Sequence, residues 1–274
     1  MGKQPKKTGR CLLTGEVGPF AKSHIIPDAF MRRASTAPFK EWDGTAMRPK
    51  RAYTGWYDTG ILGHRGEAII ANYDDAAAKC FIERGLTYRT RRDPLDLNVL
   101  TDNLVPGMVY EFKNVDSGAL HLFALSLLWR AAVSKLAAFE LVTLRPRWQE
   151  EIARRLLTGD PGPPEEFPAY FAVFCGAEEL PKMAPFRLAR HPYFYRFFLD
   201  GVVCYVSPRK RPKAGPSFEP MYVGRDPQMV SLVCVPSATS EHARRSRAQT
   251  EELFNQHGDI FRGGRRAGNF VIEE

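Results

Sequence analysis

The sequence predicts an α+β protein, with helices in the first part of the chain and a strand-rich C-terminal half. Two helical patterns support the first part of this prediction. Apolar residues recur at helical spacing after Glu67, and residues 117–139 are apolar nearly all round. Runs of aromatic and β-branched residues from Ala169 onward support the second part. A chain of 274 residues can bury two cores, and we predict units at residues 1–90 and 91–274.

The first unit has the pattern of short strands, a long loop and one helix. Residues 20–26 form a strand-like run. Residues 28–55 are rich in proline, glycine, serine, threonine and charge, so we predict an extended surface loop. A helix follows from Glu67 and stops at Gly85, and we predict that its adjacent carboxylates, Asp74-Asp75, lie on a solvated edge. The residues expected to form the small core of this unit are Ile25, Ile69, Tyr73 and Cys80.

The second unit begins with a polar, irregular boundary region over residues 86–115. The apolar helix of residues 117–139 follows. Because this helix has no polar face, we predict that it is the buried core helix of the unit. A shorter amphipathic helix comes next, with Pro146 in its first turn and Gly159 at its end.

The C-terminal half changes to strand-type patterns. Asp200-Gly201 joins two of the apolar runs and predicts a hairpin over residues 193–206. The aromatic residues of its first strand fit two roles: stacking on unpaired bases, or, since alternate strand residues face opposite sides, packing in the core. Ser240 begins a polar helix to about residue 256, and a loose, basic tail follows. The predicted strands are residues 169–175, 193–199, 202–206 and 229–235.

The chain carries 39 Lys and Arg against 31 Asp and Glu, a formal net charge of +8. A positive surplus favours a polyanionic partner such as nucleic acid, because lysine and arginine displace counterions from phosphates. A solvated basic surface is the alternative. The basic residues gather near the N-terminus, after the predicted hairpin and in the C-terminal tail. The candidate phosphate-binding residues are Lys6, Lys7, Arg209, Lys210, Arg211, Arg244, Arg245, Arg247, Arg265 and Arg266.

The composition excludes collagen-like and wholly disordered classes of protein. No apolar stretch approaches the about 20 residues that a membrane-spanning helix needs. The basic N-terminus is not followed by the apolar segment of a secretory signal. The cysteines are odd in number and form no CxxC pair, which indicates reduced thiols. We therefore expect a cytoplasmic protein without a membrane partner.

The most informative segment is Ser23-His24-Ile25-Ile26-Pro27, with Cys11 before it and residues 60–67 after it. This order of strand, His-Ile-Ile-Pro, loop, strand and helix resembles the ββα-metal finger of HNH endonucleases, in particular a divergent branch with a Ser-His-Ile-Ile-Pro motif. That branch also has a helical block like the one around Leu127-Leu128-Trp129-Arg130. The resemblance covers roughly residues 11–160. It implies a ββα finger that packs with the helical segment and the C-terminal antiparallel region.

The resemblance implies roles for four residues. His24 would take a proton from the attacking water, and Asp58, near the position of the family's middle asparagine, would orient it. Glu67 and His64 would bind Mg²⁺ or Mn²⁺, which stabilises charge on the scissile phosphate. Two alternatives stay open. A backbone carbonyl can satisfy a histidine at a strand end, and a glutamate in a first turn complements the helix dipole.

The sequence also departs from the family pattern. Many relatives hold the finger together with four zinc-binding cysteines. Here Thr14, Gly63 and Gly66 stand with Cys11 at those positions, so we expect no structural zinc. Ser23 replaces the aspartate that usually precedes the base.

Two functions fit these observations. The first is a metal-dependent endonuclease or nickase that binds double-stranded DNA, and the resemblance implies a role in phage–host conflict. The second is a non-catalytic, degenerate HNH module that binds nucleic acid or docks a protein partner. Retention of His24 favours the first function, whereas Ser23 and the missing zinc ligands favour the second.

Overall fold

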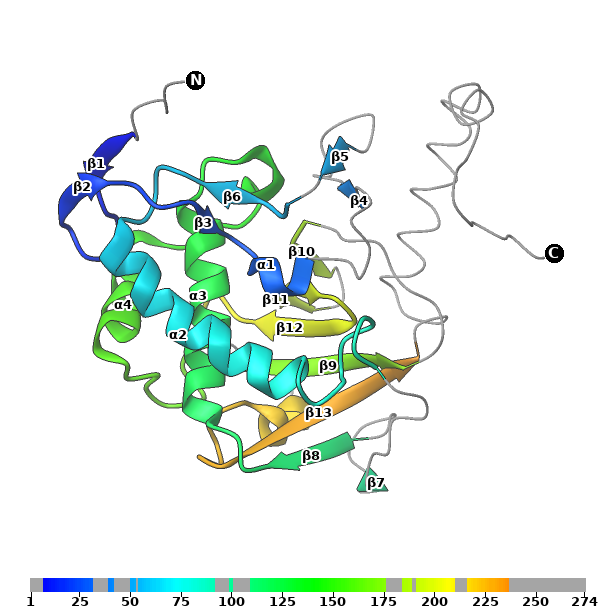
Figure 1. The fold of residues 1–274 in the computed structure, drawn as a ribbon. Coiled ribbons are helices and arrows are strands. Elements are labelled where there is room, and N and C mark those ends of the chain that lie inside the picture. The colour runs from blue at the N-terminus through cyan, green and yellow to red at the C-terminus, as the bar shows by residue number, and fades with distance from the viewer. Residues whose placement is uncertain are drawn as a thin grey trace, which may run out of the picture.

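Figure 1 shows the fold of the chain in a computed structural model, in which helices pack beside a large sheet. The predicted α+β class is confirmed. The structure describes residues 7–31, 39–41, 50–52, 54–91, 99–100, 109–175, 184–188, 191–209 and 216–236.

The strands of the C-terminal half lie in one mixed sheet. They are β7 (Val99–Leu100), β8 (Val109–Lys113), β9 (Ala169–Cys175), β10 (Phe186–Leu188), β11 (His191–Leu199), β12 (Val202–Val206) and β13 (Met229–Pro236). Over the described ranges, their order is β10-β11-β12-β9-β13-β8-β7. Neighbours pair antiparallel except β9 and β13, which run parallel, so the sheet predicted as antiparallel is mixed at this one place.

The predicted hairpin is confirmed as β11 and β12. Leu199 pairs with Val202, which leaves Asp200 and Gly201 as a two-residue turn. Both turn residues have positive φ, 54° and 95°. A turn of this kind matches the twist of the flanking strands and favours aspartate and glycine.

The prediction of an irregular boundary region over residues 86–115 is wrong near the C-terminal end of that region. Val109–Lys113 forms β8, which pairs with β13 inside the sheet. Its sequence, Val-Tyr-Glu-Phe-Lys, alternates aromatic residues with Glu111 and Lys113, which is the two-residue period of a half-buried strand. Pro106 and Gly107, which suggested an irregular segment, lie outside the described residues.

Three long helices pack beside the sheet: α2 (His64–Phe81), α3 (Ser117–Val133) and α4 (Pro146–Thr158). The central helix α3 contacts α2 and α4 as well as β9 and β12, so it lies between the other helices and the sheet (Figure 1). Its residues are buried nearly all round, as predicted. The predicted ends of α4 are also confirmed, since Pro146 begins the helix and Gly159 follows it in the left-handed region.

The core helix ends earlier than the predicted residue 139. Ser134 is extended, with ψ of 144°, and a separate 3-10 helix, η1, covers Ala137–Phe139. The Ser134 hydroxyl donates to Asp58 Oδ2 at 3.0 Å and accepts from the backbone nitrogen of Leu136 at 3.2 Å. These side-chain hydrogen bonds replace the next helical turn.

One hydrophobic core connects the N-terminal segment with the sheet. Phe30, Phe81, Phe123 and Phe171 are fully buried, and each ring contacts two of the others, with centroids 4.8–6.4 Å apart. The predicted boundary at residue 90 stays a prediction, and this core crosses it. Of the residues predicted for the small N-terminal core, Ile25 and Cys80 are buried, whereas Ile69 and Tyr73 are partly buried.

The surface loop predicted over residues 28–55 contains regular elements. Phe30 lies in the short helix α1 (Asp28–Met31), and β4 (Phe39–Glu41) pairs with β5 (Lys50–Ala52). The loop prediction is wrong at α1 because its apolar pair, Phe30 and Met31, is buried in the shared core.

Four aromatic residues of β11 are core residues, two on each face of the sheet. Tyr195 and Phe197 belong to the core on the helical side. Phe194 and Phe198 belong to a second cluster on the other face, together with Met221 of the 3-10 helix η2 (Pro216–Met221). All four are at most 4% exposed, so the base-stacking alternative is wrong for them.

The expectation of reduced thiols is confirmed for three cysteines and wrong for one. Cys11, Cys80 and Cys204 are buried free thiols, whereas Cys234 is disulfide-bonded. Disulfides are typical of oxidising compartments, so the cysteines do not by themselves indicate the cytoplasm. Among the helices of the described ranges, none is long and apolar enough to cross a bilayer. The helix predicted from Ser240 lies outside the described residues.

Candidate functional site

The segment that carries the Ser-His-Ile-Ile-Pro motif folds as strand, strand and helix. Strand β3 (Ser23–His24) pairs antiparallel with β6 (Tyr57–Asp58), and α2 follows after a short turn. The strand predicted over residues 20–26 is therefore shorter than expected. Residue Phe20 contributes a single bridge to Gly63, and β2 (Val17–Pro19) pairs with β1 (Thr8–Arg10) instead.

The four positions that correspond, in the resemblance, to the zinc cysteines of HNH fingers meet in space. The backbone nitrogen of Thr14 donates to Cys11 Sγ at 3.4 Å. A Cβ atom added to Gly66 would lie 2.9 Å from that sulfur, and one added to Gly63 would lie 3.5 Å from Cys11 Cβ. The residues present offer one sulfur where a tetrahedral zinc site needs four N or S ligands, so they do not fit structural zinc. Buried Leu62 packs there instead.

His24 lies at the end of β3, and its side chain is 20% exposed. Its Nε2 atom is 3.9 Å from Oδ1 of Asp28, which is four residues further along the chain. The centroid of its imidazole ring lies 6.0 Å from the centroid of the Tyr57 ring, and the two ring planes meet at 65°. Asp28 is a site residue that the sequence pattern does not indicate, because residue 28 lies at the start of a predicted loop. A carboxylate four residues after the histidine was the signal that could have found it.

The backbone of His24 is held by Arg130, a fully buried residue of α3. The guanidinium donates to the His24 carbonyl at 2.7 Å, and it binds both carboxylate oxygens of Asp74, at 2.7 and 3.0 Å. It also donates to the hydroxyl of Ser126 at 3.1 Å. Arg130 thus joins α3, α2 and the end of β3 in one buried network.

The solvated edge predicted for Asp74 is therefore wrong. The side chain of Asp74 is 18% exposed and pairs with Arg130. Burial raises the pKa of Asp74 to about 6, and the charge and hydrogen bonds of Arg130 oppose that rise. The negative charges of Glu67 and Asp75 also raise the pKa of Asp74.

Asp58 connects β6 to the end of α3. Its Oδ2 atom accepts from the Ser134 hydroxyl at 3.0 Å and from the Lys135 nitrogen at 3.4 Å, and its Oδ1 atom accepts from the Gly60 nitrogen at 2.8 Å. In the β3–β6 register, Asp58 pairs with Ser23 and not with His24. Its predicted role in orienting the base stays a prediction.

Glu67 and His64 lie in the first turn of α2. The two residues are three apart, so they share one face of the helix. His64 is exposed, whereas Oε2 of Glu67 is buried and has no hydrogen-bond partner within the described ranges. A buried, unpaired carboxylate oxygen of this kind is a suitable ligand for Mg²⁺ or Mn²⁺.

Across the part of the chain that the structure describes, no group of three or more His, Cys, Asp and Glu side chains is placed to hold a metal ion. Magnesium is commonly held by only one or two carboxylates, with water and substrate phosphates as its other ligands. The donor set at Glu67 therefore fits such an ion, although the described residues form no enclosed protein cage for it.

Two of the candidate phosphate-binding residues are described, and both are exposed. Lys7 lies near the turn that follows β6, because a Cβ atom added to Gly60 would be 3.8 Å from the Nζ atom of Lys7. Arg209 follows β12, and its backbone nitrogen donates to the Ser207 hydroxyl at 3.2 Å. The other candidates lie outside the described residues: Lys6, Lys210, Arg211, Arg244, Arg245, Arg247, Arg265 and Arg266.

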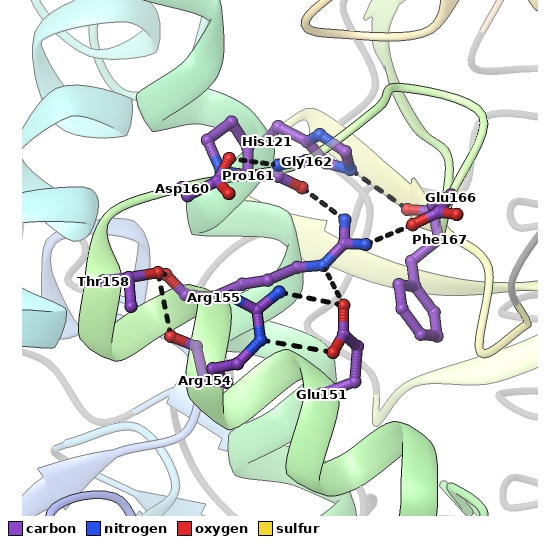
Figure 2. Close-up of polar contacts among 10 residues, drawn as sticks. All are labelled: His121, Glu151, Arg154, Arg155, Thr158, Asp160, Pro161, Gly162, Glu166 and Phe167. Atoms are coloured by element: carbon purple, nitrogen blue, oxygen red, sulfur yellow. Dashed lines mark hydrogen bonds and ion pairs between the residues drawn. The ribbon is translucent and has the colours of Figure 1, made fainter.

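A second polar cluster lies between α3, α4 and the loop that follows α4 (Figure 2). Buried Arg155 donates to Oε1 of Glu151 at 3.0 Å, to the Pro161 carbonyl at 2.5 Å, and to Glu166. Hydrogen bonds from Arg154 and Arg155 lower the pKa of Glu151 to about 2. The guanidinium is enclosed by these contacts, so the cluster fixes the loop rather than forming a second site.

Because His121 of this cluster is buried, we expect the free energy of unfolding to depend on pH. Its Nε2 atom lies 3.1 Å from the Phe167 carbonyl, and burial lowers its pKa to about 4. The unfolded chain binds a proton near pH 6.5, so the contribution of His121 to stability is lost as the pH falls from about 6.5 to 4. That loss amounts to about 3 kcal/mol. Asp74 acts in the opposite direction, because its raised pKa makes folding more favourable as the pH falls from about 6 to 4.

A comparison of the wild type with His121→Gln separates the two effects, since Asp74 is common to both proteins. We expect the difference in unfolding free energy, measured by urea denaturation, to shrink between about pH 7 and about pH 4.5. A difference that stays constant over this range would contradict a neutral, buried His121.

Comparison with known proteins gives no match: no protein-family model fits the chain, and no curated protein or solved structure is significantly similar to it.

Proposed function

We propose that this protein is an HNH-like nucleic-acid-binding protein that hydrolyses phosphodiester bonds in DNA with a divalent metal ion. The observation that supports the proposal is the arrangement of His24 and Glu67. His24 ends β3 with a partly exposed imidazole and an anchored backbone carbonyl, and the following helix presents Glu67 with an unpaired, buried carboxylate oxygen in its first turn. A role in phage–host conflict, which the resemblance implies, belongs to the same proposal.

In this mechanism His24 takes a proton from the water that attacks the phosphorus atom. The Asp28 carboxylate lies 3.9 Å from Nε2, close to the positive charge that the imidazole gains in this step. Arg130 fixes the main chain at His24, so the imidazole approaches the substrate from a constant position. Glu67 would hold Mg²⁺ or Mn²⁺, with His64 on the same helix face as a second donor. A bound ion of this type stabilises the negative charge on the phosphate.

A non-catalytic module is the second candidate. Three hydrogen bonds already occupy the carboxylate of Asp58, and Ser23 stands where relatives have an aspartate. Both observations favour a finger that retains the fold and binds nucleic acid or a protein without cleaving a phosphodiester bond.

Nicking of supercoiled plasmid with Mg²⁺ or Mn²⁺ tests the proposal. We expect His24→Ala to lower the nicking rate by about 10²–10⁴-fold, because general acid–base catalysis contributes that much. Glu67→Gln should raise the metal concentration needed for half-maximal nicking. Both variants are purified in the same way as the wild type, and their thermal unfolding is compared to show that they are folded.

Three other outcomes are informative. Nicking that persists unchanged in His24→Ala would rule out His24 as the base. If no protein nicks the plasmid but all shift DNA equally in a gel, the non-catalytic module is favoured. If the wild type neither cuts nor binds DNA, the nucleic-acid function is wrong and protein docking remains.

A further inference from the structure

The β3–β6 pair presents three chemically distinct side chains on one face. Residues 22 and 24 are two apart in an extended segment and so point to the same side, and Tyr57 lies directly across from His24. Burial follows this alternation: Lys22 is exposed, Ser23 is fully buried and His24 is 20% exposed. An ammonium group, an imidazole and a phenol ring therefore lie side by side at the end of the motif strand.

Direct contacts connect these side chains. The Lys22 Nζ atom lies 4.1 Å from the centroid of the Tyr57 ring, and that centroid is 6.0 Å from the centroid of the His24 imidazole. Tyr57 is 42% exposed. Over the described residues it is the one aromatic among the exposed large hydrophobic side chains; the others are the aliphatic residues Leu12, Val17, Leu141 and Leu157.

We propose that Lys22 and Tyr57 form a nucleotide subsite next to His24. The Tyr57 ring stacks on an unpaired base beside the scissile phosphate, and Lys22 contacts a phosphate of the same strand. This inference rests on the proposed function, because it places the subsite beside the residue that would activate the attacking water. The substrate class is DNA with unpaired nucleotides at the cleavage point, such as a gap in a duplex.

The chemistry of the two side chains favours this ligand over a fully paired duplex. An exposed aromatic ring binds any base through its π face, but the faces of bases in a paired duplex are covered by their neighbours. The ammonium of Lys22 is a mobile point charge on an exposed side chain, so it can leave the ring for a phosphate when a base arrives. The net charge of +8 supports the same partner.

Fluorescence anisotropy with a fluorescein-labelled gapped duplex tests the subsite, with the fully paired duplex of the same sequence as the reference. Binding is measured in EDTA so that cleavage does not interfere. We expect the wild type to prefer the gapped probe and Tyr57→Leu to bind it about 5- to 150-fold more weakly, which is the usual effect of losing one stacked base. Tyr57→Phe, the matched control, keeps the ring and should bind as the wild type does.

Lys22→Gln should lower the slope of log affinity against log salt concentration by about one, because one phosphate contact is lost. Both Tyr57 and Lys22 are on the surface, so these variants are expected to melt at the wild-type temperature. A Tyr57→Leu variant with a lowered melting temperature is replaced by Tyr57→Met, which keeps an apolar side chain without a ring.

The outcomes separate this inference from the proposed function. If Tyr57→Leu binds the gapped probe as tightly as the wild type while the wild type nicks plasmid, the subsite is wrong and the nuclease proposal stands. If Tyr57 is needed for binding but no protein nicks DNA, the subsite is supported and the catalytic proposal fails. Equal losses in Tyr57→Phe and Tyr57→Leu would overturn stacking, and a wild type that binds neither probe would overturn both proposals.

Discussion

Replacing Arg130 with methionine is expected to destabilise the protein by about 3–5 kcal/mol and to reduce nicking at the candidate site. The substitution leaves the carboxylate of Asp74 without its partner in a mostly buried position, and it removes the donor that binds the His24 carbonyl at 2.7 Å. Because the pKa of Asp74 is already about 6, protonation can neutralise the unpaired carboxylate in weak acid. The loss in unfolding free energy should therefore be smaller near pH 5 than near pH 8.

The matched control is the double variant Arg130→Met/Asp74→Asn, which removes both charges. We expect it to recover part of the lost stability, because an amide is easier to bury than an unpaired charge. If it folds well but still nicks slowly, with a lower kcat and unchanged DNA binding, Arg130 positions His24 as well as stabilising the fold. Full recovery of kcat in the double variant would show that the hydrogen bond to the His24 carbonyl has no part in catalysis.

Substituting Gly162 with alanine is expected to destabilise the loop after α4 more than the same change at Gly159. Both glycines have left-handed φ, 68° and 71°, so each substitution carries a backbone strain of about 1–2 kcal/mol. A Cβ atom at Gly162 would also lie 2.3 Å from Nη1 of Arg155, whereas at Gly159 the nearest atom is the Tyr73 hydroxyl at 3.9 Å. Arg155 is held by Glu166 and by the Pro161 carbonyl, so it cannot move away freely (Figure 2).

We expect Gly159→Ala to lower the free energy of unfolding by about 1 kcal/mol, and Gly162→Ala to lower it by a further ~1–3 kcal/mol through overpacking. Denaturant unfolding of the two variants measures the difference directly. Equal losses would mean that the guanidinium of Arg155 shifts at little cost, and that its network is less rigid than its hydrogen bonds indicate.

Elements fixed by local chemistry could be predicted from the sequence. Asp200-Gly201 forms the expected turn because both residues tolerate positive φ. Helix α4 runs from Pro146 to Thr158, since proline suits a first turn and glycine the left-handed position after the last turn. The positions of His24 at a strand end and of Glu67 in a first helical turn were also predictable. Their neighbours in the sequence have strand-like and helical patterns.

Elements fixed by distant partners could not be predicted. Phe30 lies in a polar, proline-rich segment, and only its contacts with Phe81 and Phe123 explain its burial. Asp74 is adjacent to Asp75 on a helix. Its neighbours in the sequence do not indicate that it pairs with Arg130, which is 56 residues further along the chain. The early end of α3 depends in the same way on Asp58, which is 76 residues before Ser134.

The link between His24 and Arg130 spans 106 residues, and this separation affects the protein during its synthesis. The ribosome makes the motif strand long before it makes α3, and domains complete their folding only when the last contributing segment has emerged. A nascent or truncated chain that ends before Arg130 has the motif but not the anchor for it. The candidate site can thus be assembled only after Arg130 has emerged, so copies of the chain that end before it carry His24 without the geometry that would let it act on nucleic acid.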